Sequence, residues 1–292
     1  MLMQRFILPK IKSSIFEKEH GVFWFSSKEL LLIWDKKKKS LFLPVGSGFA
    51  DGQVADVDVA AHTVIKLCEM IGLSAASFFI WQSATVFVPT LSSPLERKII
   101  KQVFQKAGFQ KINLVTFATA LKTFAQRQAI REGVGLYLGD DVSEAVIFSQ
   151  QEQLSLNFDY LKKSAYQTIR ELLQSEVALT VSQDSVAKLY QALGQNLEIQ
   201  SFVLRGKNIQ NQQVVTLSLS RKQLKTIIDL LQKNLELAWR RLTANNLFTN
   251  HNLDQWLVVG DAFVYHFMQK QQVAQVLFLH SELEIIQGVE WF

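Results

Sequence analysis

Two adjacent carboxylates, Asp140 and Asp141, follow Gly139 in a short polar loop between two apolar segments. Nucleotide-binding proteins often hold phosphate in such a loop, because glycines let backbone N–H groups approach the ligand. Aspartates add bulk and negative charge there. Two unit charges about 4 Å apart at an effective dielectric of about 20 repel by ~4 kcal/mol, which lowers affinity by roughly three decades. The loop therefore predicts poor phosphate binding.

Other residues that do chemistry form no recognisable pattern. The sequence contains no Walker A motif, no G-x-G-x-x-G motif and no G-x-S-x-G motif. Asp56 and Asp58 imitate the start of a calcium loop, but the turn glycine and the terminal glutamate are missing. The histidines are scattered without a second ligand at metal-binding spacing, at positions His20, His62, His251, His266 and His280. We therefore expect no metal site and no catalytic residue.

Bulk composition indicates a folded chain with two domains. Hydrophobic residues make up 48% and charged residues 20% of the 292 residues. The single cysteine, Cys68, favours a reducing, cytoplasmic setting. No apolar run approaches the ~20 residues that span a bilayer. The net charge of +5 suits an anionic partner. Nucleic acid is set aside, because the aromatic residues lie within apolar strand patterns.

Two segments repeat the same order of apolar and polar blocks, at Val22–Leu43 and Val134–Phe158. Each predicts a three-stranded antiparallel meander followed by helices and further strands. A helix is expected after Ser93, with Pro94 in its first turn and Gly108 beyond its end. A long helix is expected from Arg221. The repeated order predicts an internally duplicated α/β protein.

Several stretches resemble MreB, the rod-shape-determining bacterial actin. The segment Asp51–Val59, "DGQVADVDV", is similar to D-G-V-I-A-D-F-D-V of that family. "VFVPTLSSPLERKIIKQVFQKAG" and "VLRGKNI" followed by "TLSLSRKQL" resemble later family segments in the same order. The likeness runs from about Val22 to Gly288. It implies an actin-like duplicated ribonuclease-H-like α/β fold, with two domains around a cleft.

The resemblance also implies domain limits. Residues 1–21 form a basic apolar N-terminal segment that should remain on the protein, since it lacks a cleavage site. Domain I covers residues 22–132 plus about 281–292, and domain II covers 133–280, with 161–219 as its smaller lobe. Only Pro44–Ala50 stands where the family inserts the small lobe of domain I. We therefore expect that lobe to be missing, which puts ordinary filament formation in doubt.

The departures from the family fall on its ATP-binding loops. The resemblance puts Phe23 and Tyr137 where the family has aspartates, and a stretch from about Thr116 without carboxylates where it has the catalytic glutamate. It implies a degenerate nucleotide site, without catalytic residues, in which ATP with magnesium is disfavoured. The positions implied for this site are Phe23, Phe25, Ser26, Tyr137, Gly139, Asp140, Asp141, Glu144, Gly260 and Asp261.

One feature of the family, an apolar loop that contacts the membrane, is more pronounced in this sequence. The loop that dips into the membrane in MreB relatives corresponds to Phe78, Phe79, Ile80 and Trp81. Four consecutive large apolar residues in a loop are unusual. They favour an anionic membrane as partner and a cytoplasmic protein peripheral to the inner membrane, aided by the basic N-terminus. The alternative is that these residues begin the next strand and are buried.

The leading hypothesis is an MreB-like cytoskeletal or scaffold protein involved in cell shape, without ATP hydrolysis. Its partners would be the membrane, cell-envelope morphogenesis proteins, and either itself or another MreB-like filament protein. One alternative is an active ATP-dependent filament protein with rewired loops. The other is an actin-like adaptor of a cell-envelope or pilus assembly.

Overall fold

The computed structural model describes residues 20–26, 29–34, 37–43, 46–50, 52–73, 83–149, 153–246, 255–271, 275–279 and 285. The proposed membrane residues Phe78–Trp81, the N-terminal segment 1–19 and most of 281–292 lie outside this part of the chain. Among the described helices, none is long and apolar enough to cross a membrane.

The first sheet has the strand order β3-β2-β1-β6-β7. Its strands are β1 (His20–Phe25), β2 (Glu29–Trp34), β3 (Lys37–Phe42), β6 (Ser83–Val88) and β7 (Lys111–Thr116). The first three form an antiparallel meander, whereas β1, β6 and β7 pair in parallel. Helices α1 (Val57–Glu69) and α2 (Pro94–Lys106) pack on one face, and α3 (Phe117–Arg127) packs on the other. A short hairpin, β4 (Phe49–Ala50) and β5 (Gln53–Val54), precedes α1.

The second sheet repeats this topology in the order β10-β9-β8-β14-β15. Its strands are β8 (Gly133–Leu138), β9 (Ser143–Phe148), β10 (Gln153–Asn157), β14 (Gln255–Val259) and β15 (Gln275–Leu279). A three-stranded antiparallel meander is again followed by parallel strands. The predicted duplicated α/β fold is confirmed, and both meanders lie where the repeated sequence pattern places them.

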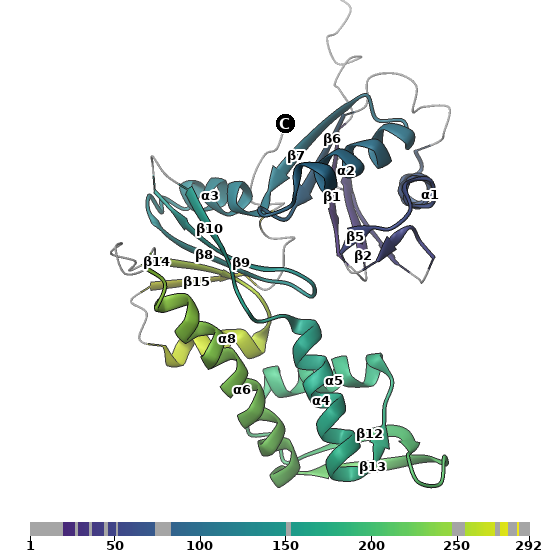
Figure 1. The fold of residues 1–292 in the computed structure, drawn as a ribbon, viewed down its shortest axis with the longest axis vertical. Coiled ribbons are helices and arrows are strands. Elements are labelled where there is room, and N and C mark those ends of the chain that lie inside the picture. Colours follow the sequence, from purple (N-terminus) through teal and green to yellow (C-terminus); the bar gives the residue numbers. More distant parts are fainter. Residues whose placement is uncertain are drawn as a thin grey trace, which may run out of the picture.

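A further lobe extends from the second sheet at the lower end of the molecule (Figure 1). It contains α4 (Lys162–Val177), β11 (Leu179–Thr180), α5 (Gln183–Gln195), β12 (Ser201–Asn208) and β13 (Val214–Ser220). The long α6 (Arg221–Thr243) leads from this lobe back to β14, and α8 (Ala262–Lys270) follows β14.

Local sequence signals explain where the helices begin. Ser93 and Glu96 form a reciprocal capping box at the start of α2, with Pro94 in the first turn. Ser220 and Gln223 form the same arrangement at α6. Gly108 adopts φ +103° just beyond α2, a conformation that glycine tolerates best. The predicted start and stop signals of α2 are therefore confirmed.

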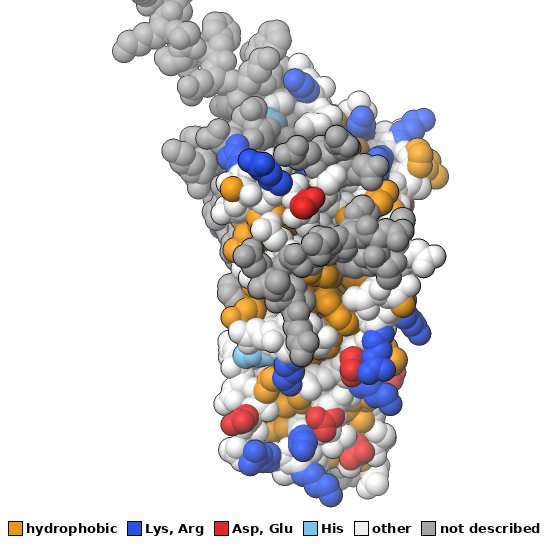
Figure 2. All heavy atoms as spheres, turned by 90° about the vertical axis from the view of Figure 1, so that its left-hand side faces the viewer, with side chains coloured by type: hydrophobic (Ala, Val, Ile, Leu, Met, Phe, Trp, Pro, Cys, Tyr) orange, Lys and Arg blue, Asp and Glu red, His pale blue; other side chains and the backbone are white. Residues whose placement is uncertain are grey.

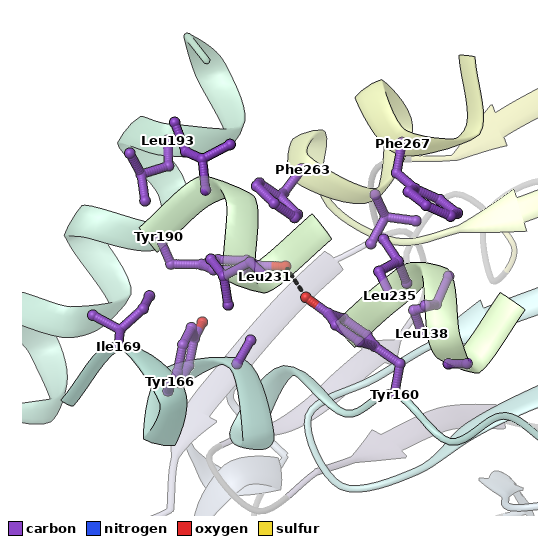
Figure 3. Packing of buried hydrophobic residues seen from close by; sticks show 14 of the residues in the cluster. Leu138, Tyr160, Tyr166, Ile169, Tyr190, Leu193, Leu231, Leu235, Phe263 and Phe267 are labelled. Carbon is purple, nitrogen blue, oxygen red and sulfur yellow. Dashed lines mark hydrogen bonds between the residues drawn. The ribbon is translucent and has the colours of Figure 1, made fainter. Parts of the chain in front are cut away.

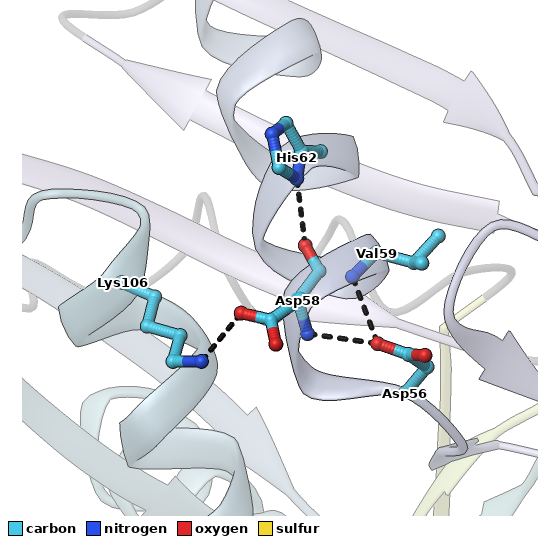
Figure 4. A network of polar contacts seen from close by, with 5 residues as sticks. All are labelled: Asp56, Asp58, Val59, His62 and Lys106. Atoms are coloured by element: carbon cyan, nitrogen blue, oxygen red, sulfur yellow. Dashed lines mark hydrogen bonds and ion pairs between the residues drawn. The ribbon is translucent and has the colours of Figure 1, made fainter.

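Asp56 and Asp58 have structural roles (Figure 4). The Asp56 side chain accepts hydrogen bonds from the backbone N–H groups of Asp58 (2.9 Å) and Val59 (3.0 Å), which caps α1. The Asp58 carboxylate forms an ion pair with Lys106 at the end of α2. The described residues contain no cluster of three metal-ligating side chains. Asp56 thus caps α1, and Asp58 joins α1 to α2.

Tyrosines fill the core where the second sheet meets its lobe (Figure 3). The hydroxyl groups of Tyr160 and Tyr190 lie 3.4 Å apart, and Tyr190 also packs against Tyr166 and Phe263. Burial raises the pKa of the Tyr166 phenol to about 12. These tyrosines are therefore neutral packing and hydrogen-bonding groups.

Charged side chains of both signs share the face seen in Figure 2. Over the lower half of that face, lysine and arginine side chains alternate with acidic ones, and hydrophobic side chains lie between them. Higher on the same face, the charged side chains in view are mostly lysine and arginine.

Candidate functional site at the domain interface

The β8–β9 loop uses its backbone to hold a helix. The Gly139 N–H closes the turn by donating to the Val142 carbonyl at 3.0 Å. The carbonyls of Gly139 and Asp140 accept hydrogen bonds from the first amides of α4, Lys162 (3.2 Å) and Lys163 (3.3 Å). A helix N-terminus is a ready anion site when its N–H groups are free. Here those two N–H groups are already paired with the loop.

Asp141 lies against domain I across the interface. A Cβ built on Gly52, in the β4–β5 turn, would lie 3.1 Å from the Asp141 carboxylate oxygen Oδ2. Gly52 also has a positive φ of +73°, so both the space and the backbone conformation favour glycine. The Asp141 side chain therefore lies close to the β4–β5 turn of domain I.

Glu144 is fully buried and joins the domains. Its Oε1 accepts a 2.7 Å hydrogen bond from the backbone N–H of Thr90, in the loop after β6. Burial raises the pKa of the Glu144 carboxyl, and hydrogen bonds from Thr90 and Leu91 and the positive charge of Arg97 oppose this rise. The Thr90 hydroxyl oxygen accepts a 2.9 Å hydrogen bond from the backbone N–H of Ala118. Thr90 thus connects β6, α3 and the second sheet.

The structure corrects the register assigned to the first loop. In each hairpin, one backbone N–H closes the turn by donating to the carbonyl three residues later, and these residues are Ser26 (2.9 Å) and Gly139 (3.0 Å). Ser26 is therefore equivalent to Gly139. Two residues earlier, Trp24 is equivalent to Tyr137, so Trp24 and not Phe23 holds the position assigned to the first aspartate.

Phe23 and Phe25 lie on the other side of β1. Phe23 has 0% exposure and packs edge-on against Phe104 (ring centroids 4.8 Å apart) and Phe109 (5.3 Å) in the core beneath α1 and α2. Phe25 packs against Phe49 at 5.4 Å. The physical reason is the two-residue period of a strand, which sends Phe23 and Phe25 to one face and Trp24 to the other.

Aromatic rings fill the base of the interface. We call the set Trp24, Phe87, Phe117 and Tyr137 the aromatic cluster; all four are buried. Trp24 stacks on Phe117 with ring centroids 4.4 Å apart and meets Tyr137 edge-on at 5.5 Å. Phe117 and Tyr137 are 4.5 Å apart. Because Tyr137 comes from the second sheet and the others from domain I, one apolar core spans both domains.

The loop between β14 and α8 is held by the side chain of Asp261. The Asp261 carboxylate caps α8 by accepting hydrogen bonds from Phe263 N–H and Val264 N–H, both at 3.1 Å. Tyr190 donates its hydroxyl to the same carboxylate at 3.2 Å, and Lys162 forms a 3.7 Å ion pair with it. Asp261 thus supplies the negative charge that the N-terminus of α8 favours. The preceding Gly260 is buried beside Leu138 and Val264.

A cavity of about 360 Å³ remains beside these contacts. Its apolar lining comes mainly from β1, the loop after β6, and α2, whereas its acidic lining includes residues from the β8–β9 hairpin. The lining residues are Phe25, Gly52, Gln53, Val54, Pro89, Leu91, Ser92, Glu96, Ile99, Ile100, Asp141, Val142, Glu144 and Asn157.

Sequence reasoning brought Asp141, Glu144 and Tyr137 to this interface but missed Trp24, Thr90 and Phe117. Phe117 stands in the stretch from Thr116 that was noted only for its lack of carboxylates. Aligning the two hairpins on their closing hydrogen bonds, rather than on the family motif, identifies Trp24. Phe23 lies in the core beneath α1 and α2, and the Gly260–Asp261 loop lies at the start of α8. Neither belongs to the aromatic cluster.

Comparison with solved structures identifies the fold. The chain is similar to MreB5 of Spiroplasma citri bound to AMPPNP, with a TM-score of 0.71 and 12% identity, over 93% of this chain and 94% of that one. It is also similar to a MamK double helical filament, with a TM-score of 0.62 and 10% identity, over 90% and 94% of the two chains. No family model and no curated protein sequence matches. The chain has an actin-like fold of the MreB and MamK type.

Proposed function

We propose that this actin-like chain is a cytoskeletal or scaffold protein that works without ATP hydrolysis. The observation that carries the proposal is the aromatic cluster. Tyr137 stands where the resemblance expects an aspartate, and Trp24 is its equivalent in the first hairpin. Phe117, which stacks on Trp24, comes from the stretch that would hold the catalytic glutamate. A magnesium ion bound with phosphates is normally held by carboxylate oxygens, and the three packed rings offer no carboxylate.

The two polar loops support the same proposal. Asp141 crosses to domain I at Gly52, and the amides of Lys162 and Lys163 are engaged by the β8–β9 loop. The N–H groups at the start of α8 are paired with Asp261. A nucleotide would have to displace these contacts and overcome the repulsion of the carboxylates. The protein therefore acts through contacts with partners rather than through turnover.

As partners we propose an anionic membrane, contacted by Phe78–Trp81 and the basic N-terminus, and filament or envelope proteins on the cytoplasmic side of the membrane. Self-association belongs to this proposal, because similar folds occur in a filament of MamK. The role would be in cell shape. An aromatic cluster in place of oxygen ligands favours a scaffold over an active ATPase.

The proposal is tested with purified protein, ATP and magnesium. Phosphate release should stay at the buffer level, and calorimetry should detect no binding of micromolar or better affinity. Replacing both loop aspartates, Asp140→Gly with Asp141→Gly, should not revive hydrolysis, because the aromatic cluster remains. Tight ATP binding by the parent, or turnover by the double variant, would overturn the proposal.

A further inference from the structure

The strand β13 is the outermost strand of the three-stranded sheet in the lobe of domain II. Among the described residues, no strand pairs with its other side. β12 and β13 lie at the lower end of the molecule, away from the interface between the domains (Figure 1). An outer strand carries backbone N–H and C=O groups that are free to pair with a strand of another chain.

The turn between β12 and β13 shows which backbone groups face outward. Asn208 N–H donates to the Gln213 carbonyl at 2.9 Å, so these two residues form a hydrogen-bonded pair. Antiparallel strands alternate between hydrogen-bonded and non-hydrogen-bonded pairs, and the register continues without interruption along β13. The N–H and C=O groups of Val214, Thr216 and Ser218 therefore point away from β12.

β13 lacks the features that normally keep an outer strand from pairing. Its sequence, VVTLSLS, contains no proline and no charged residue, and its register with β12 has no bulge. Valine and threonine favour the extended conformation. On the inner face, Val215 and Leu217 are only partly buried against the core. A further strand would cover their exposed parts and remove apolar surface from water.

Positive charge lies next to this edge on the outer face of the sheet. Arg205 and Lys207 are exposed on β12, and their cross-strand neighbours are the uncharged Thr216 and Val214. No described carboxylate forms an ion pair with either of the two basic residues. An added strand would lie roughly 10 Å from β12, two strand spacings away, and a long basic side chain and a glutamate together span that distance.

The start of α6 adds positive charge where β13 ends. Arg221 and Lys222 are exposed in the first helical turn, which contains no acidic residue. The helix dipole disfavours cations at this end of a helix, so these two charges do not stabilise α6. A carboxylate from outside the chain would be attracted by both.

We propose that β13 binds an extended, acidic segment of a partner protein, which adds a fourth strand to this sheet. The backbone of the segment pairs with the outward-facing groups of β13. Because side chains of a strand alternate between the two faces, carboxylates at every second position lie on the face of Arg205 and Lys207. Apolar residues between them lie on the inner face, beside Leu217. The inference depends neither on ATP binding nor on the membrane contact.

The test uses a fluorescently labelled peptide in which glutamate and valine alternate over seven residues, with binding measured by anisotropy. Submillimolar affinity is expected. A peptide with four glutamates followed by three valines has the same charge without two distinct faces, and it should bind at least about tenfold more weakly. An alternating peptide with glutamine in place of glutamate should weaken by a similar factor, because it lacks the charge. Equal binding of the alternating and the block peptide would overturn the proposal.

A charge variant tests the outer face. Arg205→Ser combined with Lys207→Ser should lower the affinity for the alternating peptide at least about tenfold. The matched control, Lys98→Ser combined with Lys101→Ser, removes the same charge from exposed positions on α2 in domain I and should leave the affinity unchanged. Equal losses in the two double variants would show unspecific attraction and count against a site at β13.

A backbone variant tests strand pairing. Thr216→Pro removes an outward-facing N–H and none that pairs with β12, a position that an outer strand tolerates. Peptide binding should be lost, whereas Thr216→Val keeps the N–H and should bind as the parent does. If Thr216→Pro does not fold, amide hydrogen exchange of the parent decides. Exchange at Val214, Thr216 and Ser218 should slow when the peptide binds. Bound peptide with unchanged exchange at these amides contradicts the proposal.

A second copy of the chain is the competing occupant of this edge. Sedimentation velocity should show the same association state for the parent and for Thr216→Pro. A dimer of the parent that Thr216→Pro abolishes, together with no peptide binding, would assign the edge to pairing between copies and overturn the acidic partner. Failure of the parent to bind the alternating peptide at all overturns it as well.

Discussion

Single side chains decide whether the interface is an open cleft or a packed core. Trp24 and Tyr137 are large aromatic residues, and both are buried in the aromatic cluster. Asp141 and Glu144 remain polar but are committed to the facing domain, at Gly52 and Thr90. Two rings and two carboxylates thus make contacts between the two domains.

Replacing Trp24 should measure the packing of the aromatic cluster. Trp24→Ala removes a ring that stacks on Phe117 and contacts Tyr137, so the free energy of unfolding should fall by about 3–5 kcal/mol. Leu237→Ala, at a residue that is 46% exposed on α6, should change it by no more than about 0.5 kcal/mol. Urea denaturation measures both. A loss below about 1 kcal/mol for Trp24→Ala would show that the ring is not closely packed.

His20 should make stability depend on pH. Its Nδ1 lies 2.6 Å from Ser83 Oγ and its Nε2 3.0 Å from Thr85 Oγ1. Burial, with a smaller effect of Lys111, lowers the pKa of His20 below 6.5 in the folded state. The unfolded chain then binds the proton first, so this contribution is complete above about pH 6.5 and is lost as the pH falls toward the folded pKa.

Denaturation at a series of pH values checks the sign. The parent should lose stability on acidification below about pH 6.5, and His20→Gln should lose less over the same interval. His62→Gln, at an exposed position of α1, should follow the parent. If stability instead rose on acidification in a way that His20→Gln abolished, the direction of the pKa shift would be wrong.

At the scale of elements, helix N-termini make several of the polar contacts described above. The N-terminus of α4 meets carbonyls of the β8–β9 loop, and that of α8 meets Asp261. At α2, a capping box uses Glu96 beside the cavity. The N–H groups of Lys162, Lys163, Phe263 and Val264 at these helix ends are thus paired within the chain.

The loop Phe78–Trp81 is the element proposed to contact membranes. Burying one large apolar side chain contributes roughly 1.5–3 kcal/mol, so two or three inserted residues give reversible binding after orientation costs. Replacing Phe79, Ile80 and Trp81 together by serine should abolish sedimentation with anionic liposomes while the circular dichroism spectrum stays unchanged. Nearby basic residues should make the binding of the parent weaker at high salt.

The outcome separates the anchor from the core. An unfolded triple variant would place the three residues in the core, as the alternative interpretation of the sequence has it. A folded variant that sediments as well as the parent would show that this loop is not the anchor. The matched control is Leu95→Ser, at a leucine that is 66% exposed on α2 and should not affect liposome binding.

At the scale of the molecule, one apolar core joins two similar domains. Side chains of both five-stranded sheets and of α3 meet in that core, which includes the aromatic cluster. Rings of both domains therefore pack directly against one another in it. In addition, only the short β4–β5 hairpin and its neighbours connect the first meander to α1.

Assembly should therefore be indifferent to ATP. Electron microscopy of the purified protein should show the same particles with and without ATP and magnesium, because aromatic rings occupy the base of the interface. Regular double filaments that appear only after ATP is added would contradict this. A non-hydrolysable ATP analogue serves as the control that separates binding from turnover.

The amino-acid sequence by itself determined the duplicated meanders, the limits of α2 and the start of α6. Alternating apolar residues, the Ser93 capping box and Gly108 act over a few residues, so their effects are legible locally. It also indicated that Asp140 and Asp141 oppose phosphate.

Only the tertiary structure decided which face of β1 meets domain II. A shift of one residue exchanges Phe23 for Trp24 and reverses their surroundings, and no local signal distinguishes two adjacent aromatic residues in an apolar strand. The Thr90–Glu144 hydrogen bond joins residues 54 positions apart, and the acidic, apolar cavity exists only where β1, α2 and the β8–β9 hairpin converge. Such contacts depend on how two sheets pack, which the order of residues within either one does not specify.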